Sequence, residues 1–131
     1  MNEVLQFLTE NPTFYLATVE GTTPKVRPFG FVMNYQDKLY FCTSNKKNVY
    51  KQLTQNPYFE VSATSKSHEW IRLKGKAVFN STKETRQAAL AAAPFLSNLY
   101  SADDPSFELF YIENAEANFF NMKGVVKSIK F

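Results

Sequence analysis

The stretch LYFCTSNKKNVYKQL, residues 39–53, gathers side chains that bind anions. Its first part, up to Cys42, is apolar and aromatic and predicts a strand, while the spacing of Val49, Tyr50 and Leu53 predicts a helix. The junction between them holds hydroxyl, amide and ammonium groups, on Thr43, Ser44, Asn45, Lys46, Lys47 and Asn48. A helix start leaves backbone N–H groups unpaired and carries partial positive charge, so it suits a phosphate group. A capped surface loop explains the same residues.

Two other segments add groups of the same kind. Arg27-Pro28-Phe29 lies in a predicted strand at residues 25–35, which we expect to pair directly with the strand at 39–43. An arginine there could clamp a phosphate with two parallel hydrogen bonds. Pro28 lacks a backbone donor, so we expect a bulge or a sheet edge at that point. In EWIRLKG, residues 69–75, Trp70 and Arg72 fit a flat aromatic ligand or, equally, a dimer interface.

The elements that must position these groups follow from hydrophobic periodicity and from Pro and Gly signals. We expect a short N-terminal helix before Asn11-Pro12, a helix that ends at Asn56-Pro57, a helix at 83–93 capped by Ser81 or Thr82, and a further piece at 95–100. Strands are expected at 14–19, 25–35, 39–43, 58–64, 69–79, 107–113, 117–121 and 125–131. Short turns between neighbouring strands favour a mainly β (α+β) domain over residues 1–131, with an antiparallel barrel and helices outside it.

Composition excludes several classes of protein. The chain has 131 residues and a net charge of +3, and its basic residues are dispersed, which argues against a nucleic-acid partner. No apolar stretch is long enough to span a membrane. One Cys and one His cannot build a zinc site or a disulfide, so we expect no metal and a cytoplasmic location. Cys42 is expected to be buried and unreactive, and His68 to lie at the surface.

The order of these segments resembles one family closely. FYLATVEG, KVRPFGFVMN, KLYFCTSNKKNVYKQLTQNPYFEV and EWIRLKGKAVF are similar, in order and spacing, to the pyridoxamine 5′-phosphate oxidase-like family, the FMN-binding split barrels. Within it the chain looks most like the small bacterial flavoproteins grouped with nitroimidazole-resistance proteins. The resemblance implies an antiparallel Greek-key split β-barrel with flanking helices, a homodimer, and FMN at the subunit interface.

The resemblance also implies which residues contact FMN. Those expected along the cofactor are Arg27 in contact with FMN, Pro28 and Phe29 along the flavin, Thr43 and Ser44 at the ribityl chain or phosphate, Lys47, Asn48 and Val49 at the phosphate, and Trp70 and Arg72 from the partner chain. The oxidase itself carries a Ser-Arg-Lys-like triplet before this helix, where Lys47-Asn48-Val49 stands here. The tail FFNMKGVVKSIKF offers no match for the basic residues that hold pyridoxal phosphate, which argues against vitamin B6 oxidation.

Three functions remain open from the sequence. The first is an FMN-dependent oxidoreductase, for example a two-electron reductase of a small electron-poor aromatic substrate, in which the cofactor does the chemistry. The second is an FMN carrier, sensor or storage protein without a substrate. The third is a structural dimer whose aromatic residues form only a core and an interface. No residue stands out as a general acid or base, so catalytic residues are left unassigned.

Overall fold

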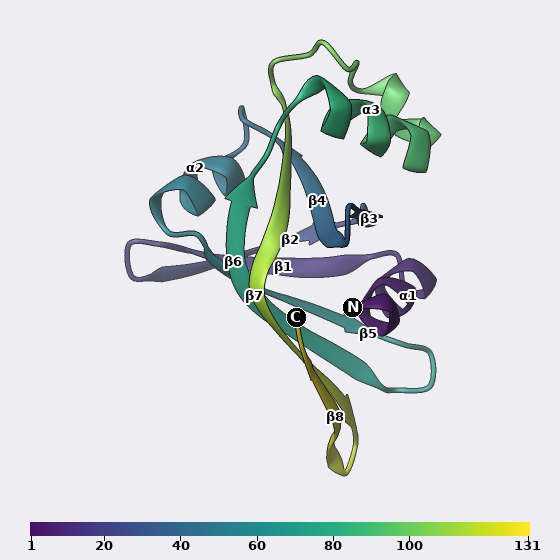
Figure 1. The fold of residues 1–131 in the computed structure, drawn as a ribbon. Coiled ribbons are helices and arrows are strands. Elements are labelled where there is room, and N and C mark those ends of the chain that lie inside the picture. Colours follow the sequence, from purple (N-terminus) through teal and green to yellow (C-terminus); the bar gives the residue numbers. More distant parts are fainter.

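The computed structural model describes residues 1–131 and shows an antiparallel sheet wound into a barrel, with helices around it (Figure 1). Its elements, in chain order, are α1 (Asn2–Glu10), β1 (Phe14–Glu20), β2 (Thr23–Phe29), β3 (Met33–Tyr35), β4 (Lys38–Ser44), α2 (Asn48–Gln55), β5 (Tyr58–Thr64), β6 (Trp70–Phe79), α3 (Lys83–Ala92), the 3₁₀ helix η1 (Pro94–Asn98), β7 (Phe107–Asn121) and β8 (Gly124–Lys130). The split-barrel α+β fold expected from the sequence is confirmed.

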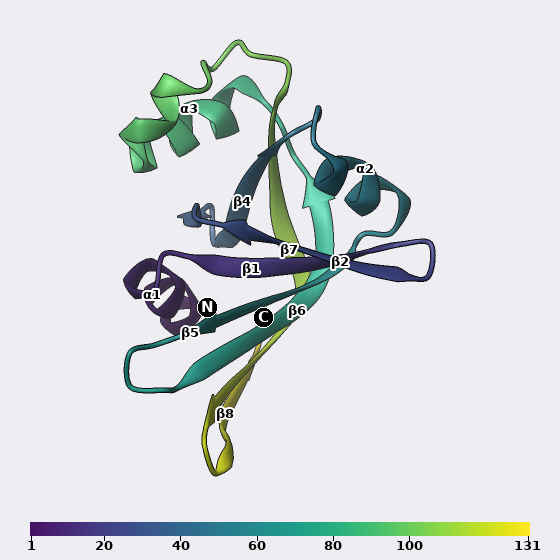
Figure 2. The same ribbon diagram turned by 180° about the vertical axis from the view of Figure 1, so that it is seen from behind.

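The order of the strands explains how the sheet closes. The hydrogen-bonded order is β2-β1-β5-β6-β7-β4-β3, with β8 added to β7. β2 and β3 therefore lie at opposite ends of this order, yet only residues 30–32 separate them in the chain. Because three residues reach only about 10 Å, the sheet must curl until its two ends meet. Figure 2 shows β2 and β4 on the same side of the molecule as α2.

Two expectations about this region are wrong. The predicted strand at 25–35 is two strands, β2 and β3, because the chain changes partner between them. Arg27 consequently does not lie on a strand paired with β4; β2 pairs with β1, where Arg27 is opposite Leu16, and only β3 pairs with β4. The sheet edge expected at Pro28 is confirmed, since β2 ends the strand order.

A single long strand replaces the two strands predicted at 107–113 and 117–121. β7 is continuous over its 15 residues, because β6 pairs with it on both sides of the predicted break. Its first part also pairs with β4 and its last part with β8. The pairing of β6 with β7 changes register between Lys74 and Lys76, opposite Asn114, whose φ is 54°. This change lets β7 continue through the point where the sequence predicted a break between two strands. The strand therefore joins the two parts of the barrel.

Aromatic side chains fill the barrel. Phe41 and Phe110 stack with centroids 5.4 Å apart, and both lie against Phe59, while Phe14 packs on Phe41. These four rings are almost completely buried. α1 and α2 close this core with apolar faces that include Val4 and Leu8 from α1 and Val49 and Leu53 from α2. A second apolar cluster lies between β3, β4 and β7 and the α3–η1 segment.

The helix boundaries agree with their sequence signals. α1 and α2 end just before Asn11-Pro12 and Asn56-Pro57. Thr82 caps α3 and accepts a hydrogen bond from the Thr85 N–H at 3.1 Å, so of the two expected caps the structure uses Thr82. Ser81 instead donates to the Glu108 carboxylate at 2.7 Å.

Gly75 is required where β6 crosses β7. A Cβ at this position would lie 2.6 Å from Cγ1 of Ile112 and 2.9 Å from the backbone oxygen of Glu113. We expect Gly75→Ala to destabilise the fold by about 1–3 kcal/mol, because a buried side chain and a strand backbone must move. Gly30→Ala is the matched control, since its Cβ would meet only the oxygen of Pro12 at 3.6 Å. Urea unfolding measures both; equal midpoints for the two variants would contradict the packing argument.

Candidate cofactor site

Two adjoining hollows lie where β2, β4 and the start of α2 meet. The first has a volume of about 170 Å³ and the second about 360 Å³. Arg27, Lys47 and Val49 line both, so these three residues form the boundary between the hollows. The first is otherwise mainly apolar and is completed by Pro28, Phe29, Gly30, Phe31, Cys42, Thr43, Phe95 and Leu96. The second is mainly polar and is completed by Glu20, Lys25, Val26, Asn48 and Gln52.

Most of the residues singled out in the sequence are brought together here. Seven line at least one hollow, namely Arg27, Pro28, Phe29, Thr43, Lys47, Asn48 and Val49. Ser44 does not line either hollow; it is buried, and its hydroxyl accepts a hydrogen bond from the Lys46 N–H at 3.2 Å. Trp70 and Arg72 do not line them either.

The start of α2 lacks a capping side chain. Lys47 occupies the cap position and makes no side-chain cap hydrogen bond, and Asn48 is the first residue of the helix rather than its cap. No side chain caps the first N–H groups of the helix. The Tyr50 N–H donates to the Lys47 oxygen at 3.2 Å, and the N–H groups of Asn48 and Val49 remain available to a ligand. Lys47 takes part in none of the protein's ion pairs. The junction therefore offers a cation and free N–H groups at one place.

The loop before α2 is held from the far side by β7 and the segment before it. The side-chain amide of Asn45 donates to the backbone oxygen of Pro105 at 2.8 Å and to the Glu108 carboxylate at 2.8 Å. The backbone N–H of Lys47 donates to the Ser44 oxygen at 3.0 Å. These bonds fix the turn that carries Lys47, so its position does not depend on a ligand.

Arg27 is held by groups that the sequence did not single out. Its Nη1 donates to the Leu16 oxygen at 3.1 Å and to the Thr18 hydroxyl at 2.8 Å, and its Nη2 donates to the Gln52 side-chain oxygen. Partial burial lowers the pKa of Arg27 from its ordinary value, but an arginine with three hydrogen-bonded acceptors remains a cation at neutral pH. Gln52 could have been found as a polar residue beside Leu53 on the buried face of α2.

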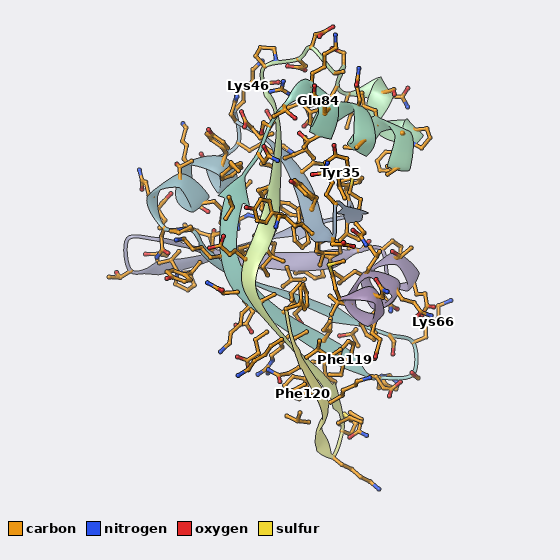
Figure 3. The ribbon with its side chains drawn as sticks, viewed as in Figure 1. Tyr35, Lys46, Lys66, Glu84, Phe119 and Phe120 are labelled. Carbon is orange, nitrogen blue, oxygen red and sulfur yellow. The ribbon has the colours of Figure 1, made fainter.

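Trp70 and Arg72 lie outside the hollows within one chain. Trp70 begins β6, and β1 and β5 lie between β6 and β2, the strand that carries Arg27. Trp70 instead stacks on Phe120 with an interplanar angle of 4°, and Arg72 lies 5.0 Å from the centre of the same ring. Figure 3 shows Phe120 at the opposite end of the molecule from Lys46.

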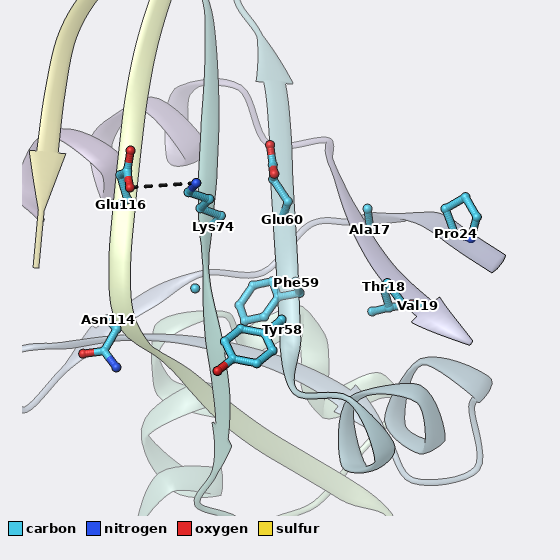
Figure 4. A pocket seen from close by; sticks show the side chains of 11 residues that line it. Ala17, Thr18, Val19, Pro24, Tyr58, Phe59, Glu60, Lys74, Asn114 and Glu116 are labelled. Atoms are coloured by element: carbon cyan, nitrogen blue, oxygen red, sulfur yellow. Dashed lines mark ion pairs between the residues drawn. The ribbon is translucent and has the colours of Figure 1, made fainter. Parts of the chain in front are cut away.

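A larger hollow, of about 520 Å³, lies elsewhere on the sheet and lacks this chemistry (Figure 4). It is lined by residues of β1, β5, β6 and β7, including Ala17, Tyr58 and Phe59. Its one cation, Lys74, is paired with Glu116 at 3.9 Å, and Glu60 adds a second carboxylate. It therefore repels a phosphate group, in spite of its size.

The hollows between β2, β4 and α2 fit a phosphorylated aromatic cofactor. Lys47, Arg27 and the start of α2 suit a phosphate, and the Pro28–Phe31 segment with Phe95 and Leu96 forms an apolar wall for a ring system. Glu20 is the one acid that lines them, and it accepts a hydrogen bond from Gln52 at 3.2 Å.

A family model described as pyridoxamine 5′-phosphate oxidase matches residues 1–121. The chain belongs to the pyridoxamine 5′-phosphate oxidase family. Among family members of known structure, a NimC/NimA family protein from Clostridium acetobutylicum is 41% identical, with a TM-score of 0.96 and coverage of 100% of this chain and 92% of that one. No curated protein is significantly similar to the sequence.

More distant structures share the fold. A pyridoxamine 5′-phosphate oxidase-related, FMN-binding protein from Nostoc punctiforme is 18% identical, with a TM-score of 0.68 over 94% of this chain and 84% of that one. The haem storage protein HutZ from Vibrio cholerae is also 18% identical, with a TM-score of 0.69 and 92% of both chains covered. This fold therefore accommodates different cofactors. The longest helix of the present family member, α3, has 10 residues, and none can cross a membrane.

Cys42 lines the first hollow and is half-buried, rather than fully buried as the sequence predicted. Burial raises its pKa to about 12, although the nearby charge of Lys47 acts in the opposite direction. A pKa raised above the ordinary value keeps the thiol protonated throughout the range in which enzymes work, and the thiolate is the nucleophile. We expect iodoacetamide at pH 8 to modify Cys42 at least tenfold more slowly in the folded protein than in urea. Mass spectrometry against time measures both rates, and equal rates would contradict the assigned burial.

Proposed function

We propose that this protein binds FMN in the two hollows and acts as an oxidoreductase on a small, electron-poor aromatic substrate. The observation that carries the proposal is the meeting of Arg27, Lys47 and the uncapped start of α2 beside an apolar wall. These groups come from parts of the chain 20 residues apart, and the barrel brings them to one place. The family membership and the FMN-binding relative support the same cofactor.

Each part of the site has a distinct task in this proposal. Lys47, Asn48 and the first N–H groups of α2 hold the phosphate, Thr43 lies along the ribityl chain, and Pro28 and Phe29 lie along the ring system. FMN supplies the electron transfer when bound. Positive charge on Arg27 and Lys47 stabilises negative charge on the ligand, and the apolar wall excludes water from it, which strengthens these interactions.

A second copy of the chain completes the site in our proposal. The outward side of the sheet carries exposed apolar residues on neighbouring strands, with Tyr15 at 51%, Val26 at 66% and Tyr58 at 65% exposure. Such a face is typical of protein interfaces. We place Trp70 and Arg72 of the partner subunit against the cofactor, in a homodimer.

Haem fits the chain less well than FMN does. Protein ligands to haem iron are His, Cys, Met or Tyr side chains. Neither hollow is lined by a His, Met or Tyr side chain, and the one histidine, His68, lies in the turn between β5 and β6. Burial raises the pKa of Cys42, which lines the first hollow, to about 12. The hollows instead offer cations and helix N–H groups, which suit a phosphate.

Arg27, Lys47, Asn48 and the start of α2 form the proposed phosphate-binding part of the site, which we call the phosphate seat. Lys47 gives its sharpest test. Riboflavin has the ring system of FMN without the phosphate, so the ratio of the two affinities isolates the phosphate contribution. We expect Lys47→Ala to weaken FMN binding by about 1.5 kcal/mol, roughly tenfold, and to leave riboflavin binding unchanged. Quenching of flavin fluorescence gives both dissociation constants.

Lys46→Ala is the matched control, because the neighbouring lysine lines neither hollow. An equal loss in both variants would mean that only the general positive charge matters. A wild-type protein that binds FMN no better than riboflavin would contradict the phosphate seat. Consumption of NADH by the FMN-loaded protein, with and without a nitroaromatic acceptor, separates an oxidoreductase from an FMN carrier.

Trp70 tests the contribution of the partner subunit. Since Trp70 lines neither hollow of its own chain, a monomeric site would not detect its loss. We expect Trp70→Ala to weaken FMN binding at least fivefold, while light scattering still gives a dimer. Phe95→Ala, within the hollow of the same chain, is the comparison. Unchanged FMN affinity in Trp70→Ala would place the partner's contribution elsewhere.

A further inference from the structure

Gln52 is a buried polar side chain that faces Arg27 from α2. Gln52 is 4% exposed and Thr18 is 2% exposed. The Gln52 side-chain oxygen accepts a hydrogen bond from the Thr18 hydroxyl at 2.5 Å and another from Nη2 of Arg27. Its amide nitrogen donates to the Glu20 carboxylate at 3.2 Å. That last bond fixes which end of the amide faces Arg27, because a reversed amide would set N–H groups against N–H groups.

These acceptors occupy one edge of the Arg27 guanidinium. Nη1 donates to Thr18 and Nη2 donates to Gln52, and the two acceptor oxygens are 2.5 Å apart. Because these two oxygens are so close, they accept the two parallel N–H groups on the Nη1–Nη2 edge of the guanidinium, one from each nitrogen. The remaining Nη1 hydrogen is taken by the backbone oxygen of Leu16 at 3.1 Å.

The other edge of the guanidinium has no partner in the protein. No hydrogen bond from Nε is present, and Nη2 makes only the bond to Gln52. The Nε–Nη2 edge carries two parallel N–H groups, which is the arrangement that binds a phosphate or carboxylate through two hydrogen bonds. Arg27 lines the same hollow as Lys47 and Asn48 at the start of α2.

The acceptors that hold Arg27 are all neutral. They are a hydroxyl, an amide oxygen and a backbone oxygen, and Glu20 reaches Gln52 but forms no ion pair with Arg27. A carboxylate at position 52 would make a similar bond but would neutralise the arginine. The amide therefore fixes the guanidinium and leaves its whole charge for a ligand.

We propose that Gln52, with Thr18, is a positioning residue that holds Arg27 by its Nη1–Nη2 edge and so presents the Nε–Nη2 edge to the phosphate of FMN. The identity of the ligand rests on the proposed function. The arrangement also links α2 to β1 and β2, so the two halves of the phosphate seat keep a fixed distance.

The test compares FMN with riboflavin in variants at position 52. Gln52→Met keeps the length of the side chain and removes the acceptor, and Gln52→Glu keeps the acceptor and adds a charge. We expect both to reduce the preference for FMN over riboflavin about tenfold, with riboflavin affinity unchanged. Gln55→Met, at an exposed position of the same helix, is the matched control and keeps the wild-type preference.

A double-mutant cycle separates positioning from general loss of structure. If Gln52 acts through Arg27, then Gln52→Met causes no further loss of FMN preference in an Arg27→Met background. Additive losses would overturn the proposal, and so would a wild-type preference in Gln52→Met. A wild-type protein with no preference for FMN would remove the phosphate seat itself, so failure of the proposed function has a different signature.

A measurement on the unaltered protein covers the case in which a variant does not fold. In the ¹⁵N–¹H spectrum we expect the Arg27 Nε–H signal to shift on addition of FMN, with a much smaller shift on addition of riboflavin. We also expect separate Nη signals before any ligand is added, because the held edge restricts rotation. Averaged Nη signals in the free protein, or an Nε–H signal that FMN does not move, would overturn the proposal.

Discussion

The curl of the sheet is the constraint on which the site depends. β2 and β3 lie at the two ends of the strand order, but residues 30–32 tie them together, so the barrel has to close. This closure carries Arg27, on an edge strand paired only with β1, to the start of α2, which follows β4. Without it the arginine and the lysine of the junction would be separated by most of the sheet. The meeting of Arg27 with the start of α2 is therefore a product of barrel topology rather than of direct strand pairing.

The long strand β7 gives the barrel the rigidity that this closure needs. It pairs with β6 along its length, with β4 in its first part and with β8 in its last part. The stacked rings of Phe41 and Phe110 join β4 to β7 from inside the core. At the same end, Asn45 is bonded to Glu108 of β7, so the loop that carries Lys47 is fixed to the most extensively paired strand of the fold. Rigid elements thus hold each cationic group before any ligand arrives.

Charge is arranged differently on the two sides of the sheet. The hollows beside α2 contain cations whose charge is not cancelled, because Arg27 is held by neutral acceptors and Lys47 makes no ion pair. In the larger hollow, Lys74 is paired with Glu116. By volume alone the larger hollow would be the candidate site for an anionic ligand, whereas the unpaired cations make the two smaller hollows beside α2 the better candidate. Structures that share this fold include an FMN-binding and a haem-storing protein, so local chemistry, and not the barrel, decides the ligand.

The sequence by itself determined the elements and most of the site. Periodicity and Asn-Pro signals gave the helices and most strands, and anion-binding residue types pointed to the 43–49 junction and to Arg27, because these signals are local. Strand partners were decided only by tertiary structure. The sequence could not show that 25–35 changes partner, that 107–121 is continuous, or that Trp70 lines neither hollow, since each depends on pairing between distant residues. Gln52 likewise becomes informative only once the fold sets it against Arg27, because a buried amide has no meaning until its partners are known.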